Sequence, residues 1–125
     1  MKIKFVYKVL PVLVFYTDNL DPKWGGYCYG PVVKIRKKYE NDEGLLQHEL
    51  VHSKQFYRTL TLHGIAYKLF ETYRVHSEVE AYKKQASYYQ DKEVSYQWMA
   101  DAILQKYDVK GFTKTEVLDL LRNLR

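Results

Sequence analysis

Apolar and polar residues alternate near the start of the chain, and apolar residues recur at helical spacing over most of the rest. Ile3, Phe5 and Tyr7 alternate with Lys4, Val6 and Lys8. Residues 12–16 are rich in β-branched and aromatic side chains, and residues 31–37 alternate again. Period-two alternation is typical of half-buried strands. These segments predict a small N-terminal sheet, which we expect to be antiparallel. Residues 17–30 between them are rich in Asp, Asn, Pro and Gly and predict a loop.

A long helix is predicted over residues 43–62, which contain no proline and, after Gly44, no glycine. Asn41 and Asp42 stand just before it and have side chains that can cap a helix N-terminus. Plotted at about 100° per residue, its residues fall on an outer polar face, a stripe around His48, and a second, apolar stripe. The apolar stripe consists of Leu46, Leu50, Tyr57 and Leu60. The helix is therefore expected to be buried on two sides.

The second half of the chain predicts further helices. Residues 65–73 form an apolar segment, and Ser77 with Glu80 has the spacing of a capping box that would open the next helix. Residues 92–107 have helical character, and Thr113 with Glu116 forms a second capping-box pattern. The last helix has an apolar stripe of Val117, Leu118, Leu120, Leu121 and Leu124. No repeat or low-complexity linker interrupts the chain, so we predict one α+β domain over residues 1–125.

Composition narrows the class of protein. The net charge of +5 is spread along the chain without a block of like charges, so it favours solubility rather than nucleic-acid binding. The single cysteine, Cys28, cannot form an internal disulfide and predicts a reducing, cytoplasmic location. The apolar N-terminal run is interrupted by Lys8 and Pro11 and has no small-residue cleavage site, so we expect neither a signal peptide nor a transmembrane segment.

The chemistry of the chain centres on the sequence His48-Glu49-Leu50-Val51-His52, an H-E-x-x-H pattern within the long helix. Residues four apart on a helix lie one turn above each other, so both histidines can reach one metal ion. Glu49 lies about 100° around the helix from His48, where a general base for a metal-activated water has to stand. Imidazole ligands favour zinc, and a catalytic zinc site needs a third protein ligand.

Two glutamates downstream could supply this ligand. Glu78 and Glu80 are two residues apart and therefore point about 200° from each other on a helix. Glu80 has a predicted role in the capping box, whereas Glu78 shares its face with Tyr82, Gln85 and Tyr89. This favours Glu78 as the third ligand, with Glu80 as the alternative.

The pattern His48-Glu49-x-x-His52, followed by Gln55 and then by Glu78-x-x-Ala81, resembles the minimal gluzincin metallopeptidases. In these small zinc enzymes, H-E-x-x-H on one helix is joined by a glutamate from the next, and short proteins with H-E-x-x-H-x-x-Q occur in bacteria and their phages. The resemblance covers residues 31 to about 90. Its spacing again implies Glu78 as the ligand, and it implies a peptide or protein substrate.

The resemblance further implies that the strand at 31–37 borders the cleft and pairs with an extended peptide through Val33, Lys34 and Ile35. In related families an Asp that supports a metal-bound histidine follows the alanine, but this chain has Tyr82 there. A backbone carbonyl or another carboxylate would have to replace that support. Tyr82 is either a core residue or a hydroxyl donor to a developing oxyanion.

Two histidines remain outside the motif. His63 precedes Gly64 and is expected to act as a C-terminal cap of the long helix, where it would interact with the helix dipole. His76 adjoins Ser77 near the predicted ligand helix, so a contact with substrate is expected of it as an alternative to a surface position.

These patterns predict a zinc metalloendopeptidase in which zinc is bound by His48, His52 and Glu78. Glu49 would take a proton as water attacks a peptide carbonyl and would pass it to the leaving amine. The alternative is a structural or interaction protein, for example in a virion, in which zinc only links two helices. An intact Glu49 favours catalysis, because a structural site needs no base beside its metal. The sequence leaves the substrate and the oligomeric state open.

Overall fold

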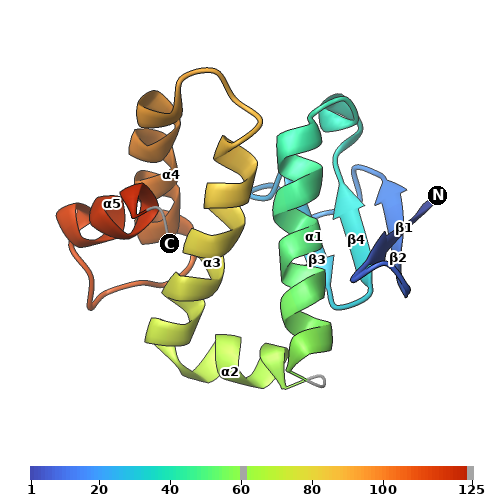
Figure 1. Ribbon diagram of the computed structural model, residues 1–125, viewed down its shortest axis with the longest axis horizontal. Helices are drawn as coiled ribbons and strands as arrows, with labels where there is room; N and C mark the ends of the chain where they lie inside the picture. The colour runs from blue at the N-terminus through green and yellow to red at the C-terminus, as the bar shows by residue number, and fades with distance from the viewer. Residues whose placement is uncertain (60–61, 124–125) are drawn as a thin grey trace.

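The computed structural model describes residues 1–59 and 62–123, and in these residues a mixed sheet occupies one side of the molecule and five α-helices the other (Figure 1). The strands are β1 (Lys2–Val6), β2 (Leu10–Tyr16), β3 (Gly26–Tyr29) and β4 (Val32–Ile35). Their order in the sheet is β1-β2-β4-β3. The predicted α+β class and N-terminal sheet are confirmed.

The expectation of an antiparallel sheet is wrong at one pair of strands. β1 and β2 form an antiparallel hairpin and β3 pairs antiparallel with β4, but β2 and β4 run parallel. After β2 the chain crosses to the far edge, forms β3 within the segment predicted as a loop, and returns through a turn at Gly30. Gly30 has φ +69°, which glycine adopts without steric strain. β4 is thus inserted between β2 and β3 in the direction of β2.

The strand at 31–37 was expected to be an exposed edge, and this expectation is also wrong. β4 has β2 on one side and β3 on the other, so both of its edges are paired. Val33 and Ile35 are fully buried against the helical layer. Neither the backbone of β4 nor these two side chains can receive a peptide. The free edges belong to β1 and β3.

The helix α1 (Glu43–Arg58) lies against the sheet and is capped as predicted, because Asp42 accepts a hydrogen bond from the backbone N–H of Leu45 at 3.0 Å. It ends at Arg58, four residues before the predicted boundary. Leu60 and Leu124, which belong to the two predicted apolar stripes, lie outside the described residues.

The third helix begins earlier than the sequence pattern predicts. A short helix α2 (His63–Leu69) is followed by α3 (Glu71–Ala86), in which Ser77 and Glu80 are interior residues rather than a capping box. The reason is tertiary: the Ser77 hydroxyl donates to the Gln55 side chain of α1, and Glu80 accepts from the same side chain. The S-x-x-E pattern reflects these contacts and not a helix start.

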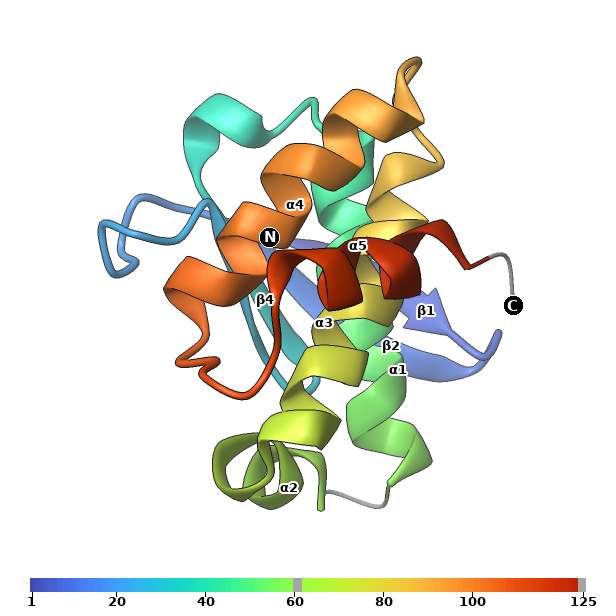
Figure 2. The same cartoon turned by 90° about the vertical axis from the view of Figure 1, so that its left-hand side faces the viewer.

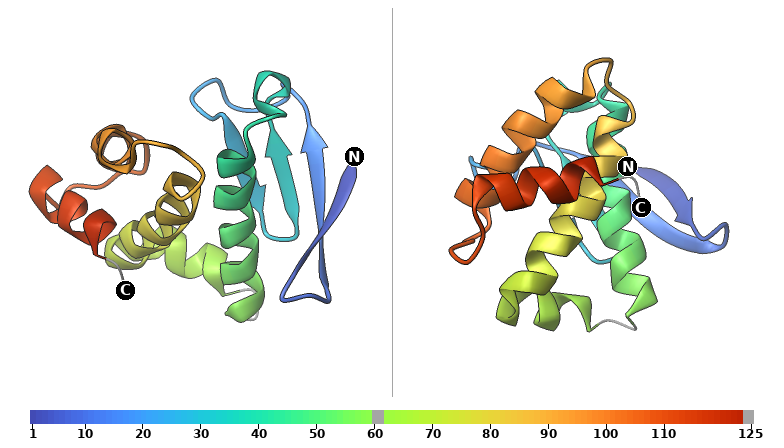
Figure 3. Two further views of the ribbon diagram at one scale, coloured as in Figure 1. Left: turned by 45° about the horizontal axis from the view of Figure 1, so that its top comes forward. Right: turned by 60° about the vertical axis from the view of Figure 1, so that its left-hand side comes forward.

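Helices α4 (Lys92–Lys106) and α5 (Lys114–Arg122) cover the side of α3 that faces away from the sheet (Figure 2). The predicted capping box at α5 is confirmed, since Thr113 and Glu116 bond reciprocally. The layers are therefore sheet, α1, α3, and the α4–α5 pair (Figure 3). No helix of the described residues is long and apolar enough to cross a membrane.

Two apolar cores result from this layering. One joins β1, β2 and β4 to the inner face of α1 through valines, leucines and Ile35. The other joins α3 to α4 and α5 around Val75, Met99, Ile103 and Leu121. The face of α1 that meets α3 is different, because it carries buried His48, His52 and Gln55. The candidate site lies at this polar contact between the two cores.

Candidate metal centre

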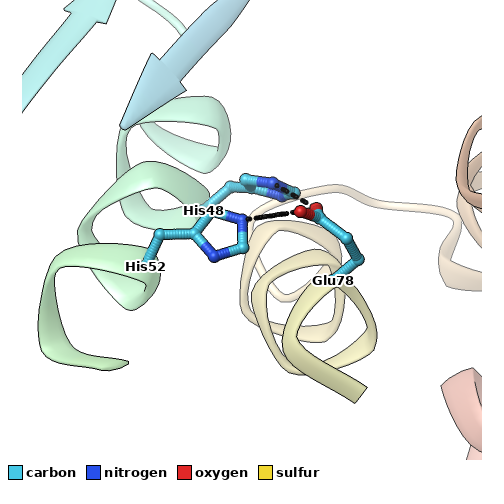
Figure 4. A group of neighbouring side chains, drawn as sticks. All are labelled: His48, His52 and Glu78. Atoms are coloured by element: carbon cyan, nitrogen blue, oxygen red, sulfur yellow. Dashed lines mark hydrogen bonds and ion pairs between the residues drawn. The ribbon is translucent and has the colours of Figure 1, made fainter. Parts of the chain in front are cut away.

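His48 and His52 project from successive turns of α1 toward Glu78 on α3 (Figure 4). All three side chains are buried. The Nε2 atom of His48 lies 3.3 Å from Oε1 of Glu78, and Nε2 of His52 lies 3.2 Å from Oε2 of the same carboxylate. These three residues form a group that could hold a metal ion. The helical-face argument that selected Glu78 over Glu80 agrees with this grouping.

The spacing of these atoms fits metal coordination. Bonds of about 2.0–2.1 Å from a tetrahedral metal to nitrogen and oxygen place neighbouring ligand atoms about 3.3 Å apart. Oε1 of Glu78 lies 3.3 Å from Nε2 of His48 and 3.3 Å from Nε2 of His52, which matches this value. Two imidazoles and one carboxylate leave one position of a tetrahedron open. The three ligand atoms lie within 4.8 Å of one another, so the group could hold a metal ion.

The charges of the three groups are strongly coupled. Burial raises the pKa of Glu78, but the charge of His52 and the hydrogen bonds from both histidines outweigh burial and hold this pKa well below its ordinary value. Burial lowers the pKa of His52, whereas Glu78 raises it and prevails, giving about 9. The carboxylate thus draws a positive charge into the site. A proton on Nε2 of His52 and a metal ion at that atom are alternatives, so a metal ion bound there would displace the proton.

Glu49 follows His48 on α1 and lies beside the metal group, where it is almost fully buried. Gly26 of β3 packs directly over it: a Cβ atom at Gly26 would lie 3.1 Å from Oε2 of Glu49. Burial raises the pKa of Glu49, the two histidines lower it, and Glu78 raises it further. A carboxyl group with a raised pKa beside a metal group is suited to accept and return a proton.

His52 is oriented by Gln55, one turn further along α1. Oε1 of Gln55 accepts from Nδ1 of His52 at 2.9 Å and from the Ser77 hydroxyl at 2.6 Å. Its Nε2 donates to Glu80 at 2.8 Å, and Glu80 is also bound by Arg58 at 3.2 Å. The expectation of a backbone carbonyl or another carboxylate is wrong for His52, because the side-chain amide oxygen of Gln55 supports it instead. Glu80 supports Gln55 and does not join the metal group.

Nδ1 of His48 differs, because it is buried and has no hydrogen-bond partner among the described residues. The ring of His48 is instead held by Tyr82, whose ring lies edge-on at a centroid distance of 4.3 Å. The Tyr82 hydroxyl bonds to that of Tyr107 at 3.1 Å. Tyr82 is buried on the side of His48 that adjoins a smaller cavity of about 260 Å³. Its predicted role as an oxyanion donor stays a prediction, and its observed contact is packing.

A cleft of about 610 Å³ opens in front of the metal group. One wall is β3 and its flanks, and the opposite wall comes from α2, α3 and the segment after α4. Residues of both walls and of α1 line it, namely Trp24, Gly26, Tyr27, Cys28, Tyr29, Gly30, His48, Glu49, His52, Phe56, His63, Gly64, Tyr67, Lys68, Arg74, Glu78, Tyr107 and Asp108. The metal group thus faces an open, largely aromatic cleft.

Two residues of this cleft were not expected from the sequence. The hydroxyl of Tyr67 on α2 donates a hydrogen bond to Oε2 of Glu78. Burial and the charge of Glu78 raise the pKa of Tyr67 far above its ordinary value. His63 was expected to cap α1, but it starts α2 and lies in the cleft, with its ring centroid 6.0 Å from that of His52. The Tyr73 hydroxyl bonds to Nδ1 of His63 at 2.8 Å, and burial lowers the pKa of His63 to about 4. The four-residue spacing of His63 and Tyr67, one helical turn, is the only signal that linked them.

The remaining predicted substrate residues lie elsewhere. His76 is on the exposed side of α3, where its Nδ1 bonds to the backbone oxygen of Thr72, so the expected contact with the cleft is wrong. It falls two residues before Glu78 and therefore points about 200° away from it. Lys34 projects from the sheet face opposite α1, above the ring of Tyr29. The edge strand that borders the cleft is therefore β3, not β4 as expected.

Comparison with models of known protein families, with curated proteins and with solved structures finds no match for this chain.

Proposed function

We propose that this protein is a zinc-dependent metallopeptidase. The observation that carries the proposal is the buried group His48, His52 and Glu78 opening onto a cleft that Glu49 also lines. Two imidazoles and a carboxylate are the ligand set of many zinc peptidases, and zinc in such a site polarises a carbonyl and lowers the pKa of a water molecule to about 7. A site that only links two helices needs neither an open cleft nor a buried base beside it.

Glu49 is the general base in this proposal. Its carboxylate takes a proton from the attacking water and later gives it to the amine that leaves. The raised pKa of Glu49 brings the carboxyl group closer to the pH at which both transfers proceed. Gly26 leaves just enough room for the carboxylate, since any larger residue there would press on Oε2.

An extended peptide would bind along the free edge of β3. The backbone N–H of Arg36 donates to the oxygen of Gly25, so in the antiparallel ladder Gly25, Tyr27 and Tyr29 face β4 with their polar groups. The backbone groups of Gly26 and Cys28 then face the cleft, next to Glu49. Strand addition at this edge places a peptide bond in front of the metal group.

Tyr67 and His63 lie on the opposite wall of the cleft and provide hydrogen-bond donors. The Tyr67 hydroxyl, now bound to Glu78, and an N–H of His63 can donate to the oxygen of the peptide carbonyl as negative charge develops on it. The bond from Tyr73 holds the His63 ring in place. The aromatic lining of the cleft, including Trp24, Phe56 and Tyr107, favours peptides with bulky apolar side chains.

Cys28 is a free thiol at the floor of this cleft, which fits a reducing compartment such as the cytoplasm. Its Sγ contacts the Ser53 hydroxyl at 3.3 Å and the backbone oxygen of Gly30 at 3.2 Å. These contacts hold β3 against α1. Cys28 therefore has a structural role, which is to hold β3 against α1.

The experiment is a comparison of wild type, Glu49→Gln and Glu43→Gln. Glu43 is an exposed carboxylate on the first turn of the same helix and serves as the matched control. Zinc content is measured first, and we expect about one zinc per chain in all three proteins. Cut sites in a denatured protein mixture are then mapped by mass spectrometry. Loss of a general base lowers the rate about 10²–10⁴-fold, so only Glu49→Gln should lose the cuts. Zinc binding with identical cut patterns in all three would leave a structural zinc protein instead.

A further inference from the structure

The outer face of the sheet, which is the face opposite α1, is apolar on β1 and β2 and carries one lysine, Lys34, on β4. The cross-strand register places Ile3 beside Leu13 and Leu13 beside Val32, with Phe5 beside Pro11. Phe15 and the two tyrosines of β3 continue the same face. No element of the described residues covers this face, which looks away from all five helices in Figure 3. A sheet with one solvated face normally has polar residues there.

The sequence of β2 independently indicates that the outer face of the sheet is covered. Its seven residues, LPVLVFY, are all apolar or aromatic. Continuous apolar runs are typical of strands covered on both faces, whereas a half-exposed strand alternates. Val12 and Val14 are fully buried against α1, and Leu13 and Phe15 point the other way. The sequence of β2 is therefore typical of a strand packed on both faces, but in the described residues only its α1 face is packed.

We propose that a second copy of this chain covers the face, by packing the outer faces of two sheets on each other around a two-fold axis. Sheets pack face to face in this manner about 10 Å apart, with the side chains of both faces interleaved. In a two-fold interface the same patch serves both partners, so an apolar patch without charge at its centre is self-complementary. The outer face of β1 and β2 meets this condition.

The distribution of charge supports the same occupant. Lys2 and Lys4 alternate with Ile3 and Phe5 and so project on the α1 side of the sheet, away from the patch. Lys34 is on the outer face of β4, between its cross-strand neighbour Phe15 of β2 and the ring of Tyr29 of β3. It would therefore stand at the rim of an interface centred on β1 and β2. A patch for an acidic partner or an anionic lipid surface would present its lysines at the centre instead.

The exposed area of the β1 side approaches what a dimer needs. Met1, Ile3 and Phe5 are 72%, 52% and 60% exposed. At roughly 200 Å² for a fully exposed large side chain, these three leave about 370 Å² open. Two copies would then bury roughly 740 Å² from these residues, and the partly buried Leu13, Phe15 and Val32 bring the total toward the roughly 1,000 Å² that a specific interface needs. Because the patch is centred on β1 and β2, the cleft at β3 stays open in the dimer.

The test is the molar mass of the zinc-loaded protein by light scattering and sedimentation, from about 1 to about 300 µM, a span that brackets micromolar dissociation constants. The variant Ile3→Glu/Phe5→Glu is compared with Ile65→Glu/Phe70→Glu, which replaces the same residue types on other elements at 59% and 61% exposure. We expect the wild type and the control to form dimers. The β1 variant should dissociate at least about 100-fold more readily, since two anchors of the interface are lost. Its zinc content should not change.

A wild type that stays monomeric over this range would overturn the proposal, and so would a dimer that the β1 substitutions leave intact. Dissociation of both variants alike would also overturn it, because the interface would then lie elsewhere. A wild type that stays monomeric yet binds anionic vesicles would assign the face to lipid. If the charged variant does not fold, Ile3→Thr/Phe5→Thr keeps β-strand propensity and repeats the test. None of these outcomes depends on peptidase activity, so the dimer and the proposed function stand or fall separately.

Discussion

Gln55→Leu should weaken metal binding and stability together, although Gln55 does not belong to the metal group. The leucine has nearly the same volume, so the change removes polar contacts without opening a large cavity. Gln55 is fully buried and its amide makes four hydrogen bonds: it accepts from His52 and from the Ser77 hydroxyl, and it donates to the Ser77 backbone oxygen and to Glu80. After the substitution, the Nδ1 hydrogen of His52 has only the Ser77 hydroxyl nearby, at 3.3 Å.

The magnitude follows from the groups left without partners. A buried polar group that loses its partner costs about 1–3 kcal/mol, and the Ser77 hydroxyl can restore part of the bond to His52. We expect the substitution to lower the free energy of unfolding by about 2–4 kcal/mol, which for a chain of this size lowers the melting temperature by roughly 6–15 °C. A metal-bound histidine that loses its orienting partner lowers metal affinity about 10–100-fold.

The assay is a zinc titration against a competing chromophoric chelator, together with thermal unfolding of the metal-free and zinc-loaded protein by circular dichroism. Gln47→Leu is the control, because Gln47 lies on the same helix and its side chain donates to exposed Glu43 at 2.9 Å. It should change the free energy of unfolding by no more than about 0.5 kcal/mol. If Gln55→Leu binds zinc as tightly as Gln47→Leu does, the orienting role of Gln55 is refuted.

Two further predictions test the site at other points. Glu78→Gln should sharply reduce zinc affinity because a charged ligand is lost. The zinc affinity of Glu80→Gln should stay within a few fold of wild type because Glu80 only supports Gln55. A loss of zinc from Glu80→Gln alone in the same titration would reject Glu78 as the ligand. Burial raises the pKa of Cys28 from 9.0 to about 12, so at pH 8 the thiolate fraction is on the order of 10⁻⁴ and the native protein should react with a thiol reagent only after denaturant is added. The sign for stability follows: the folded state holds the thiol proton more tightly, so stability is lost as pH rises above 9 toward 12. Fast labelling of the native protein at pH 8 would contradict the raised pKa of Cys28.

Local periodicity alone determined the elements whose residues lie close together in sequence. The spacing of His48 and His52 is one helical turn, so any helix through them aligns their side chains. Asp42 and Thr113 cap their helices through bonds to backbone groups three residues away, which is also a local relation. Glu78 was separated from Glu80 by the same geometry, since residues two apart on a helix cannot share a face. These features depend only on residues close in sequence, so they do not depend on how the rest of the chain folds.

Tertiary structure decided which elements became neighbours. β4 and β2 pair across a segment of the chain that itself contributes β3, so strand order, and with it the free edge at the cleft, depended on long-range pairing that no local pattern encodes. Ser77 had the spacing of a cap but serves Gln55 on another helix, because the approach of α1 and α3 gave its hydroxyl a buried partner. Tyr67 reaches Glu78 for a similar reason: the turn between α2 and α3 folds a residue eleven positions away back onto the carboxylate. Periodicity predicts which face a side chain lies on, but only the packing of the layers decides what that face meets.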